Sequence, residues 1–253
     1  MNLLLKINKN KWILNIFIFF IILIIWQLIS VCILSNSILL PSPIDVMKSL
    51  KNMFFTGEIF YHLSISIFRV LTGFFISVIL GIFLGILMGL YKTIYNILNP
   101  ILRFLCPIPP IAWLPLAILW FGIDEGSKIF IIIIASFFPI FTNVIHGVWQ
   151  IDDKYLEIVH LYKVSTYKFL RQLLLPSIFP YIVSGCRIGL GYAWMGILAA
   201  ELTSGLLGVG YLLVDARALG ETDKVIALMI IIGIIGKCMD NLIVIITSKI
   251  YHL

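Results

Sequence analysis

The chain has 253 residues, of which 61% are hydrophobic and 12% charged, and its formal net charge is +6. A soluble domain of this length carries about twice that share of charged residues and could not bury so much apolar surface, so the composition excludes a soluble fold. The basic residues are spread along the chain, which argues against a nucleic-acid partner and makes them signals of membrane topology. The four cysteines lie far apart in apolar runs, so neither a metal site nor a disulfide framework is predicted.

The first apolar run, 12–34, is 23 residues long, and a membrane-spanning helix needs about 20. Lysines precede it as in a signal peptide, but the run is too long and no cleavage site follows, so we predict a spanning helix. A more polar stretch follows at 40–62. There Ser42-Pro43 and Asp45 predict the start of a short surface helix.

A second span is predicted at 70–91, because this stretch contains no charged residue. Gly81, Gly85 and Gly89 recur at four-residue spacing and therefore share one helix face, where another helix can approach closely. We expect that face to pack inside one subunit, although it is also a candidate contact with a second subunit. The third apolar run, 104–123, contains four prolines, which predict a span broken near its start.

The fourth span is predicted at 129–151, with a kink at Pro139, and the fifth at about 177–200. The fifth contains Arg187 about ten residues from its start, near the middle of the membrane. An arginine at that depth costs at least about 2.5 kcal/mol, so its guanidinium must face a partner or a wet cavity. Two roles follow for it: binding backbone carbonyls of the broken third span, or lining a path that favours an anion.

The sixth span, at about 225–247, contains Lys237 and Asp240, three residues apart on one helix face. Six spans with a cytoplasmic N-terminus place ten lysines and arginines in the inside segments and five in the outside segments, which favours that orientation. We therefore predict an all-α membrane protein with about six transmembrane helices and with both termini in the cytoplasm.

One segment on the predicted cytoplasmic side, 152–176, is unusual because seven of its 25 residues are charged. Its apolar residues recur at helical spacing, which predicts two short helices joined near 163–165, with Ser165 or Thr166 as the cap of the second. Its mixture of acidic and basic residues suits an anionic lipid surface poorly. A protein partner is therefore expected.

This segment resembles the EAA motif of ABC importer permeases, through which the permease docks into its ATPase subunit. Glu157 stands at the position of the motif's glutamate, and Leu175-Pro176 closes the motif at the expected distance. Lys163 occupies the position of the motif's glycine, so we expect a tight turn between the two helices to be disfavoured. The coupling residues that the resemblance implies are Glu157, Leu161, Lys163, Ser165, Leu175 and Pro176.

The flanking sequences "PIPPIAWLPLAILWFGIDEGSKIFIII" at 107–133 and "LPSIFPYIVSGCRIGLGYAWMGILAAEL" at 175–202 resemble the nitrate, sulfonate and taurine branch of these permeases. The resemblance extends over about residues 40–250. It implies a type I ABC importer permease fold with cytoplasmic coupling helices, in which an N-terminal transmembrane helix and an outer connecting segment at 1–63 precede the permease domain at 64–250.

The translocation path implied by this resemblance is expected to include Arg187, Glu201, Trp113, Asn143 and Trp194. If Arg187 lines that path, we expect Glu201 to be a gate or the counter-charge of Arg187.

The same resemblance implies a transport subunit of the bacterial plasma membrane that has no catalytic activity and no cofactor of its own. Its expected partners are two copies of a cytoplasmic ABC ATPase, an extracytoplasmic solute-binding protein and a second permease copy in a homodimer. The expected cargo is a small anion such as nitrate, a sulfonate or taurine.

Three other functions are weighed against this one. Permeases for thiamine-type pyrimidine precursors share much of the pattern, so that cargo stays open. An ion-coupled secondary transporter could use Arg187, Glu201, Lys237 and Asp240 as a relay, but such proteins are usually longer and contain internal repeats, which this sequence lacks. A membrane enzyme is disfavoured because the four histidines are isolated and no nucleophile–base signature occurs.

Overall fold

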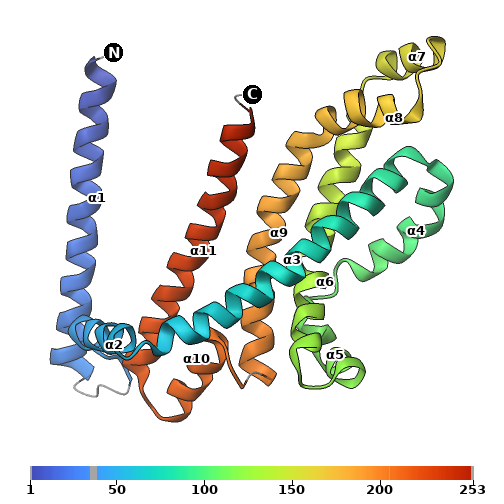
Figure 1. Cartoon of the computed structure of the whole chain (residues 1–253). Coiled ribbons are helices and arrows are strands. Elements are labelled where there is room, and N and C mark those ends of the chain that lie inside the picture. The colour runs from blue at the N-terminus through green and yellow to red at the C-terminus, as the bar shows by residue number, and fades with distance from the viewer. Residues whose placement is uncertain (1, 35–38, 205, 252–253) are drawn as a thin grey trace. The chain divides into compact units, whose positions relative to one another are not determined.

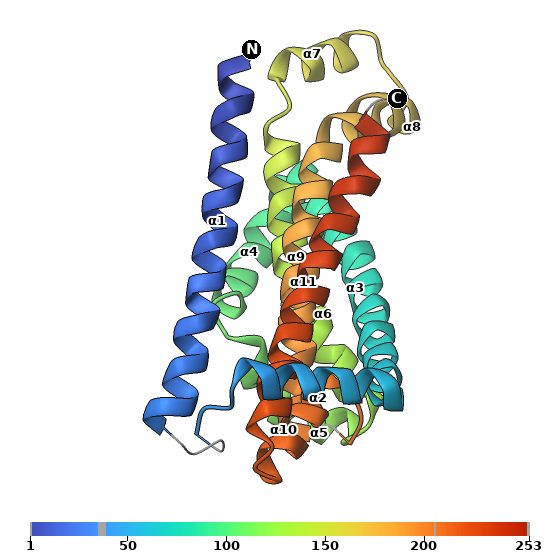
Figure 2. The ribbon, with the colours of Figure 1, turned by 90° about the vertical axis from the view of Figure 1, so that its left-hand side faces the viewer.

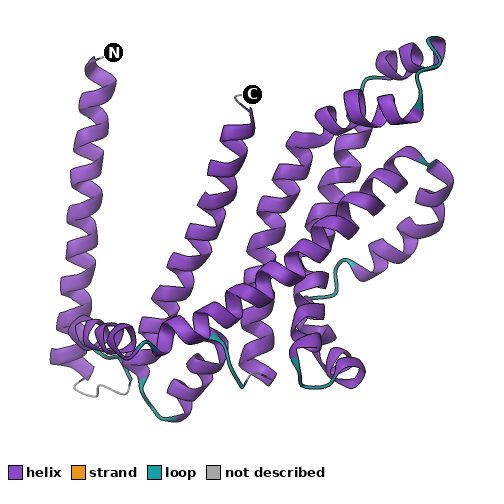
Figure 3. Cartoon of the chain, in the orientation of Figure 1, coloured by secondary structure: helices purple, strands orange, loops and turns teal. Residues whose placement is uncertain are grey.

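A computed structural model describes residues 2–34, 39–204 and 206–251, and within these ranges all regular secondary structure is helical (Figures 1 and 3). The chain divides into two compact units, residues 1–61 with 212–232 and residues 62–211 with 233–253. In chain order the elements are α1 (Asn2–Leu28), the π-helical turn η1 (Ile29–Leu34), α2 (Pro43–Thr56), α3 (Glu58–Leu90), α4 (Lys92–Leu105), the 3-10 turn η2 (Pro110–Trp113), α5 (Leu114–Phe121), α6 (Glu125–Trp149), α7 (Asp153–Leu161), α8 (Thr166–Lys168), the π-helical turn η3 (Phe169–Leu174), α9 (Leu175–Ser204), α10 (Val209–Ala218) and α11 (Thr222–Tyr251).

The described ranges contain five or six candidate membrane spans. Five helical stretches, drawn from α1, α3, α6, α9 and α11 and the turns beside them, are long and apolar enough to span a bilayer. The pair of α4 with η2 and α5 is bent by 93° and counts as a sixth span if it crosses the membrane as one broken helix. These findings confirm the predicted all-α fold class with about six spans, and the third apolar run is interrupted as predicted.

The break in the third span lies at residues 106–109, between α4 and η2. Pro107 and Pro109 lack the backbone N–H that a continuous helix would need there. The predicted span began at residue 104, whereas α4 begins at Lys92 and also contains Arg103. Because α4 is amphipathic, its polar face kept it below the hydropathy expected of a spanning helix.

Helix α6 is the centre of the second unit, and the glycine face of α3 packs against it. A Cβ atom added to Gly81 would lie 2.8 Å from Ile140 Cγ2, and one added to Gly85 would lie 2.7 Å from Val144 Cγ1. Such distances are below van der Waals contact, so only glycine lets the two backbones approach this closely. The face is therefore used inside the chain, as expected, and is not a free surface for a second subunit.

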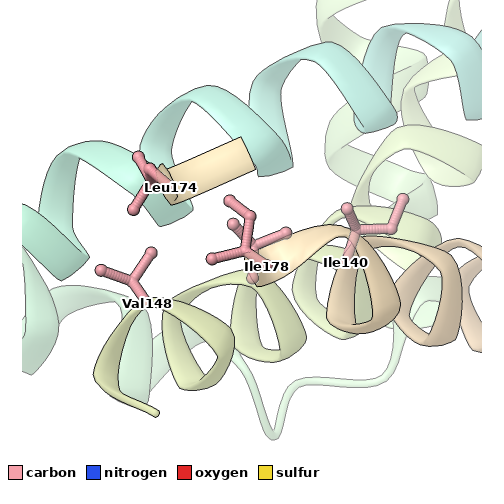
Figure 4. Close-up of a cluster of buried hydrophobic side chains, with 5 residues drawn as sticks. Ile140, Val148, Leu174 and Ile178 are labelled. Atoms are coloured by element: carbon pink, nitrogen blue, oxygen red, sulfur yellow. The ribbon is translucent and has the colours of Figure 1, made fainter. Parts of the chain in front are cut away.

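Helix α9 packs along another side of α6, and both views show the two helices running side by side (Figures 1 and 2). Gly185 and Gly189 permit this approach, since a Cβ on Gly189 would lie 2.8 Å from Ile140 Cγ1. Buried aliphatic side chains fill the seam between α6 and the start of α9, and Figure 4 labels four of them. They are Ile140, Val148, Leu174 and Ile178.

In the first unit, α2 begins as the sequence predicts. Ser42 is its N-cap, and its hydroxyl accepts the Asp45 backbone N–H at 3.2 Å while donating to Asp45 Oδ2 at 2.7 Å. The hydrogen bond from Ser42, with a weaker contribution from Lys48, lowers the pKa of the Asp45 carboxyl. The Ser49 hydroxyl donates to Asp223 Oδ2 at 2.6 Å, which ties α2 to the first turn of α11.

Candidate translocation site and coupling surface

The segment predicted to contact an ATPase forms two helices, α7 and α8, joined by a tight turn. Lys163 has φ +47°, and among the described residues it alone has a positive φ without being glycine. The N–H of Val164 donates to the Val159 carbonyl at 3.0 Å and closes the turn. The turn that Lys163 was expected to disfavour is therefore present: the lysine adopts the left-handed conformation itself, at a cost of about 1–2 kcal/mol.

The six predicted coupling residues all have exposed side chains and lie on one short stretch of chain. Ser165 is the N-cap residue of α8 by position, but its side chain makes no capping hydrogen bond. Around Glu157, α7 also exposes several large apolar side chains, of which Leu161 is 79% exposed. The others are Tyr155 and Ile158, and Tyr162 directly after the helix is exposed as well.

A second candidate site lies on α9 and α11, where Arg187, Lys237 and Asp240 form a charged cluster, which we name the Arg187 triad. Arg187 donates from Nε to Asp240 Oδ1 at 2.5 Å and from Nη2 to Asp240 Oδ2 at 3.0 Å. Lys237 Nζ donates to the same Oδ2 at 3.0 Å. Both hydrogen bonds of Arg187 within the described residues thus go to Asp240, so the alternative in which Arg187 binds carbonyls of the third span is not observed.

Two members of the Arg187 triad border a cavity of about 560 Å³ whose lining comes from α9 and α11, whereas Lys237 contacts Asp240 from outside that lining. Arg187 and Asp240 line it together with the predicted path residue Trp194. The Arg187 side chain is 49% exposed and the Asp240 side chain 30% exposed, so the charges face open space and not a closed core.

A smaller cavity of about 310 Å³ lies between the broken third span, α6 and α9, and Asn143 lines it. The Asn143 side-chain amide donates to the Pro139 carbonyl at 2.8 Å. Ile188 and Tyr192 of α9 line both cavities, so one face of α9 separates them. Trp113 lines neither of these two cavities and packs against the apolar cluster around Leu114.

Glu201 lies in a buried polar network near the end of α9, which we name the Arg69 cluster; its members are Ser66, Arg69, Glu125, Lys128 and Glu201. Arg69 Nη1 donates to Glu201 Oε1 at 2.7 Å, and the other arm of the guanidinium binds both carboxylate oxygens of Glu125 at 2.5 Å. The Ser66 hydroxyl donates to Glu201 at 2.8 Å. Glu201 is therefore the partner of Arg69, and the prediction that it is the counter-charge of Arg187 is wrong.

The Arg69 cluster also fixes the backbone that follows α9. Arg69 Nη1 donates to the Leu207 carbonyl at 2.7 Å, and the N–H of Gly210 donates to Glu201 Oε2 at 2.9 Å. Gly208 has φ +119°, and a Cβ atom there would collide with the Glu201 carboxylate. Glycine is thus required at this position on both conformational and steric grounds.

Residues 77–251 match the family described as the inner membrane component of binding-protein-dependent transport systems. This match covers more than half of the chain. The chain belongs to this family of permeases.

The curated relatives cover nearly the whole permease. It is 36% identical over 242 residues to the putative aliphatic sulfonates transport permease protein SsuC of Bacillus subtilis, which covers 96% of this chain and 88% of the relative. It is 36% identical to the nitrate import permease protein NrtB of Synechocystis sp., covering 90% and 85%. It is 34% identical to the taurine transport system permease protein TauC of Escherichia coli, covering 87% and 82%.

Family membership confirms the sequence-based identification of a transport subunit and not an enzyme. As a component of a binding-protein-dependent system in the inner membrane, the permease works with an ATPase subunit and a solute-binding protein. The ion-coupled transporter and the membrane enzyme are thereby set aside.

Sequence reasoning missed Arg69 and Glu125 because it used charged residues to mark where spans begin. Arg69 immediately precedes the predicted second span, but α3 begins at Glu58 and holds this arginine eleven residues inside the helix. A signal was present nonetheless. Arg69 and Glu201 are opposite charges at the rims of two apolar runs, and such groups inside a membrane protein usually pair.

Proposed function

We propose that this permease forms the path for a small anionic solute. The observation that carries the proposal is the Arg187 triad, in which two cations share one carboxylate beside a cavity of about 560 Å³. Charged side chains inside membrane segments are costly and usually mark a transport path. A net positive site of this kind attracts an anion, and the planar guanidinium suits an oxyanion head group.

The position of the triad along its helices supports this role. Arg187 is twelve residues from the start of α9, or about 18 Å along a helix of 30 residues. The hydrocarbon core is about 30 Å thick, so this is near its middle. The relatives named as permeases for aliphatic sulfonates, nitrate and taurine all take solutes with an anionic group, in agreement with such a site.

Uptake by cells that contain the whole transporter tests the cargo class. Labelled nitrate, taurine, hexanesulfonate and bicarbonate are offered one at a time, with a neutral pyrimidine precursor as the comparison. We expect energy-dependent uptake of at least one anion or amino-sulfonate, abolished when the solute-binding protein is deleted. Uptake of the neutral pyrimidine alone would refute the proposal.

We further propose that the ATPase docks on residues 152–176 and that both termini are cytoplasmic. Exposed apolar side chains such as Leu161 and Tyr162 lie outside the spanning helices, where they serve a protein contact better than water. Glu157 is expected to make an ion pair or helix-cap contact there.

Glu157→Lys should therefore reduce co-purification of the ATPase with the permease and reduce uptake. Lys154→Glu provides a charge-reversal comparison on the same helix. Full ATPase retention and full uptake in Glu157→Lys would contradict the assignment.

A homodimer is proposed as the translocating unit, because one chain supplies one coupling segment and the predicted engine has two ATPases. The glycine face of α3 is already covered by α6. An apolar part of α9 outside the two cavities, which includes the exposed Leu202, is then the remaining candidate contact. Native mass spectrometry of the purified complex should find two copies of this chain with two ATPases; a single copy, or a second and different permease, would refute it.

A further inference from the structure

Asp240 pairs with two cations at once. Its two carboxylate oxygens accept Arg187 Nε and Nη2 and also Lys237 Nζ. Arg187 Nη1 has no hydrogen-bond partner among the described residues, and Lys237 uses one of its three N–H groups. Arg187 therefore keeps a free donor group in the cavity lining, and Lys237 adds positive charge through its contact with Asp240.

The charge count of the triad points to a weak anion site and not a tight one. Arg187 and Lys237 contribute two positive charges and Asp240 one negative charge, so the net charge is +1. Without Asp240 an anion would meet two unscreened cations in a medium of low dielectric constant, where their attraction is large. Conduction requires binding that is strong enough for entry but weak enough for release.

We propose that Asp240 is the counter-charge that limits how tightly this cavity holds an anion, and that Lys237 adds a second positive charge to the site through its contact with Asp240. The ligand class is a small oxyanion head group, planar or tetrahedral, that shares the Arg187 guanidinium with Asp240 and takes the unused donor of Arg187. This inference deepens the proposed anion transport and rests on it.

A purely structural role for the same contacts makes a different prediction. If Asp240 only joins α11 to α9, its removal should lower stability and change the potential in the cavity, but it should leave the affinity of the cavity for an anion unchanged. Two readouts are therefore needed, the potential and the apparent affinity for an anion, both measured at a residue of the cavity lining. Met195 lines the cavity and its side chain is 69% exposed.

The experiment places a single cysteine at this position with Met195→Cys, after replacement of Cys32, Cys106, Cys186 and Cys238 by alanine. Membrane vesicles that contain the whole transporter are treated with anionic 2-sulfonatoethyl methanethiosulfonate or with cationic 2-(trimethylammonium)ethyl methanethiosulfonate. The ratio of the two labelling rates reports the local charge, because a change in access affects both reagents alike. We expect Asp240→Asn to raise the anion-to-cation ratio about threefold to tenfold and Lys237→Gln to lower it by a similar factor.

Asp124→Asn is the matched control, because it removes one exposed carboxylate of the same unit at the first turn of α6. Asp124 directly precedes Glu125 of the Arg69 cluster. Glu201 of the same cluster lies 14 residues, or about 21 Å, from Arg187 along α9, and this distance is beyond the Debye length. The ratio should be unchanged in this variant. If Asp240→Asn is poorly produced, Lys237→Gln still gives a decisive test, because in that variant Asp240 keeps its pair with Arg187 and the helices stay joined.

The second measurement uses nitrate as the probe anion. Labelling of the same cysteine by uncharged methyl methanethiosulfonate is followed as nitrate is raised, and the concentration that halves the rate should fall severalfold in Asp240→Asn. Unchanged reagent ratios in both triad variants, or no labelling of the parent by either charged reagent, would overturn the inference. These measurements read the cavity and not the uptake of cargo, so their failure is distinguishable from failure of anion transport.

Discussion

Arg69 and Arg187 both lie inside spanning helices of this permease, and their surroundings are opposite in kind. The Arg69 side chain is 2% exposed, and the Arg69 cluster balances two cations against two carboxylates. The Arg187 side chain is 49% exposed, and its triad has two cations for one carboxylate. The difference teaches that burial of Arg69 and Glu201 with balanced charge suits a structural role, whereas the partial exposure and surplus charge of the triad support the proposed binding of a solute.

The largest effect expected from this comparison is the loss of Arg69. Arg69→Gln leaves Glu201 buried without its cation, and breaking a buried pair in this way costs about 3–5 kcal/mol. Folded yield in detergent and the unfolding temperature should both fall sharply. Arg187→Gln, the matched change in the exposed triad, should keep most of the folded yield, and equal losses in the two variants would remove the distinction.

Gly208→Ala tests the Arg69 cluster from its backbone side. The added methyl group collides with the Glu201 carboxylate, and the alanine must adopt the backbone φ of +119° that Gly208 has. Backbone strain and overpacking together should destabilise the protein by about 2–3 kcal/mol, seen in thermal unfolding of the purified complex. Gly233→Ala is the control, since nothing lies within 4 Å of the Cβ it would add; a loss of the same size there would point to general intolerance of the change.

Arg187→Lys tests the other half of the comparison. The charge is kept, but the planar fork that can hold Asp240 and an oxyanion together is lost. We expect the complex to assemble with the folded yield of the parent, while uptake of the anionic cargo falls about tenfold, or 1.4 kcal/mol in transport. Normal uptake, or failure only through misfolding, would give Arg187 a structural role like that of Arg69.

The spans were predictable because hydropathy and proline placement report directly on what a bilayer accepts. The run 70–91 and the proline cluster in 104–123 both correspond to observed elements. The ion pairs were not predictable, because Arg187 and Asp240 are 53 positions apart and Arg69 and Glu201 are 132 apart. Sequence shows that each charge needs a partner, but helix packing decides which partner it meets.

The partners of Glu201 and Arg187 also show why the predicted path residues separated. Glu201 is near the end of α9 and meets Arg69 of α3, whereas Arg187 is near the middle of α9 and meets α11. The spacing of 14 residues on one helix placed them about 21 Å apart. Helical rise alone, applied at the outset, would have excluded a direct pair between them.

We expect the left-handed Lys163 to make the proposed coupling segment, residues 152–176, a compromise between the stability of the isolated permease and the strength of its contact with the ATPase. A glycine would adopt φ +47° without steric penalty, although it would also gain entropy in the unfolded chain. Lys163→Gly should therefore stabilise the purified permease by zero to about 1 kcal/mol in thermal unfolding, yet weaken its retention of the ATPase. A glycine variant that binds the ATPase as tightly as the parent would mean that the lysine carries no such advantage. If stability rises while ATPase retention falls, the strained turn is retained because the ammonium group of Lys163 serves the assembled transporter. Selection for assembly has then outweighed selection for the stability of the single subunit.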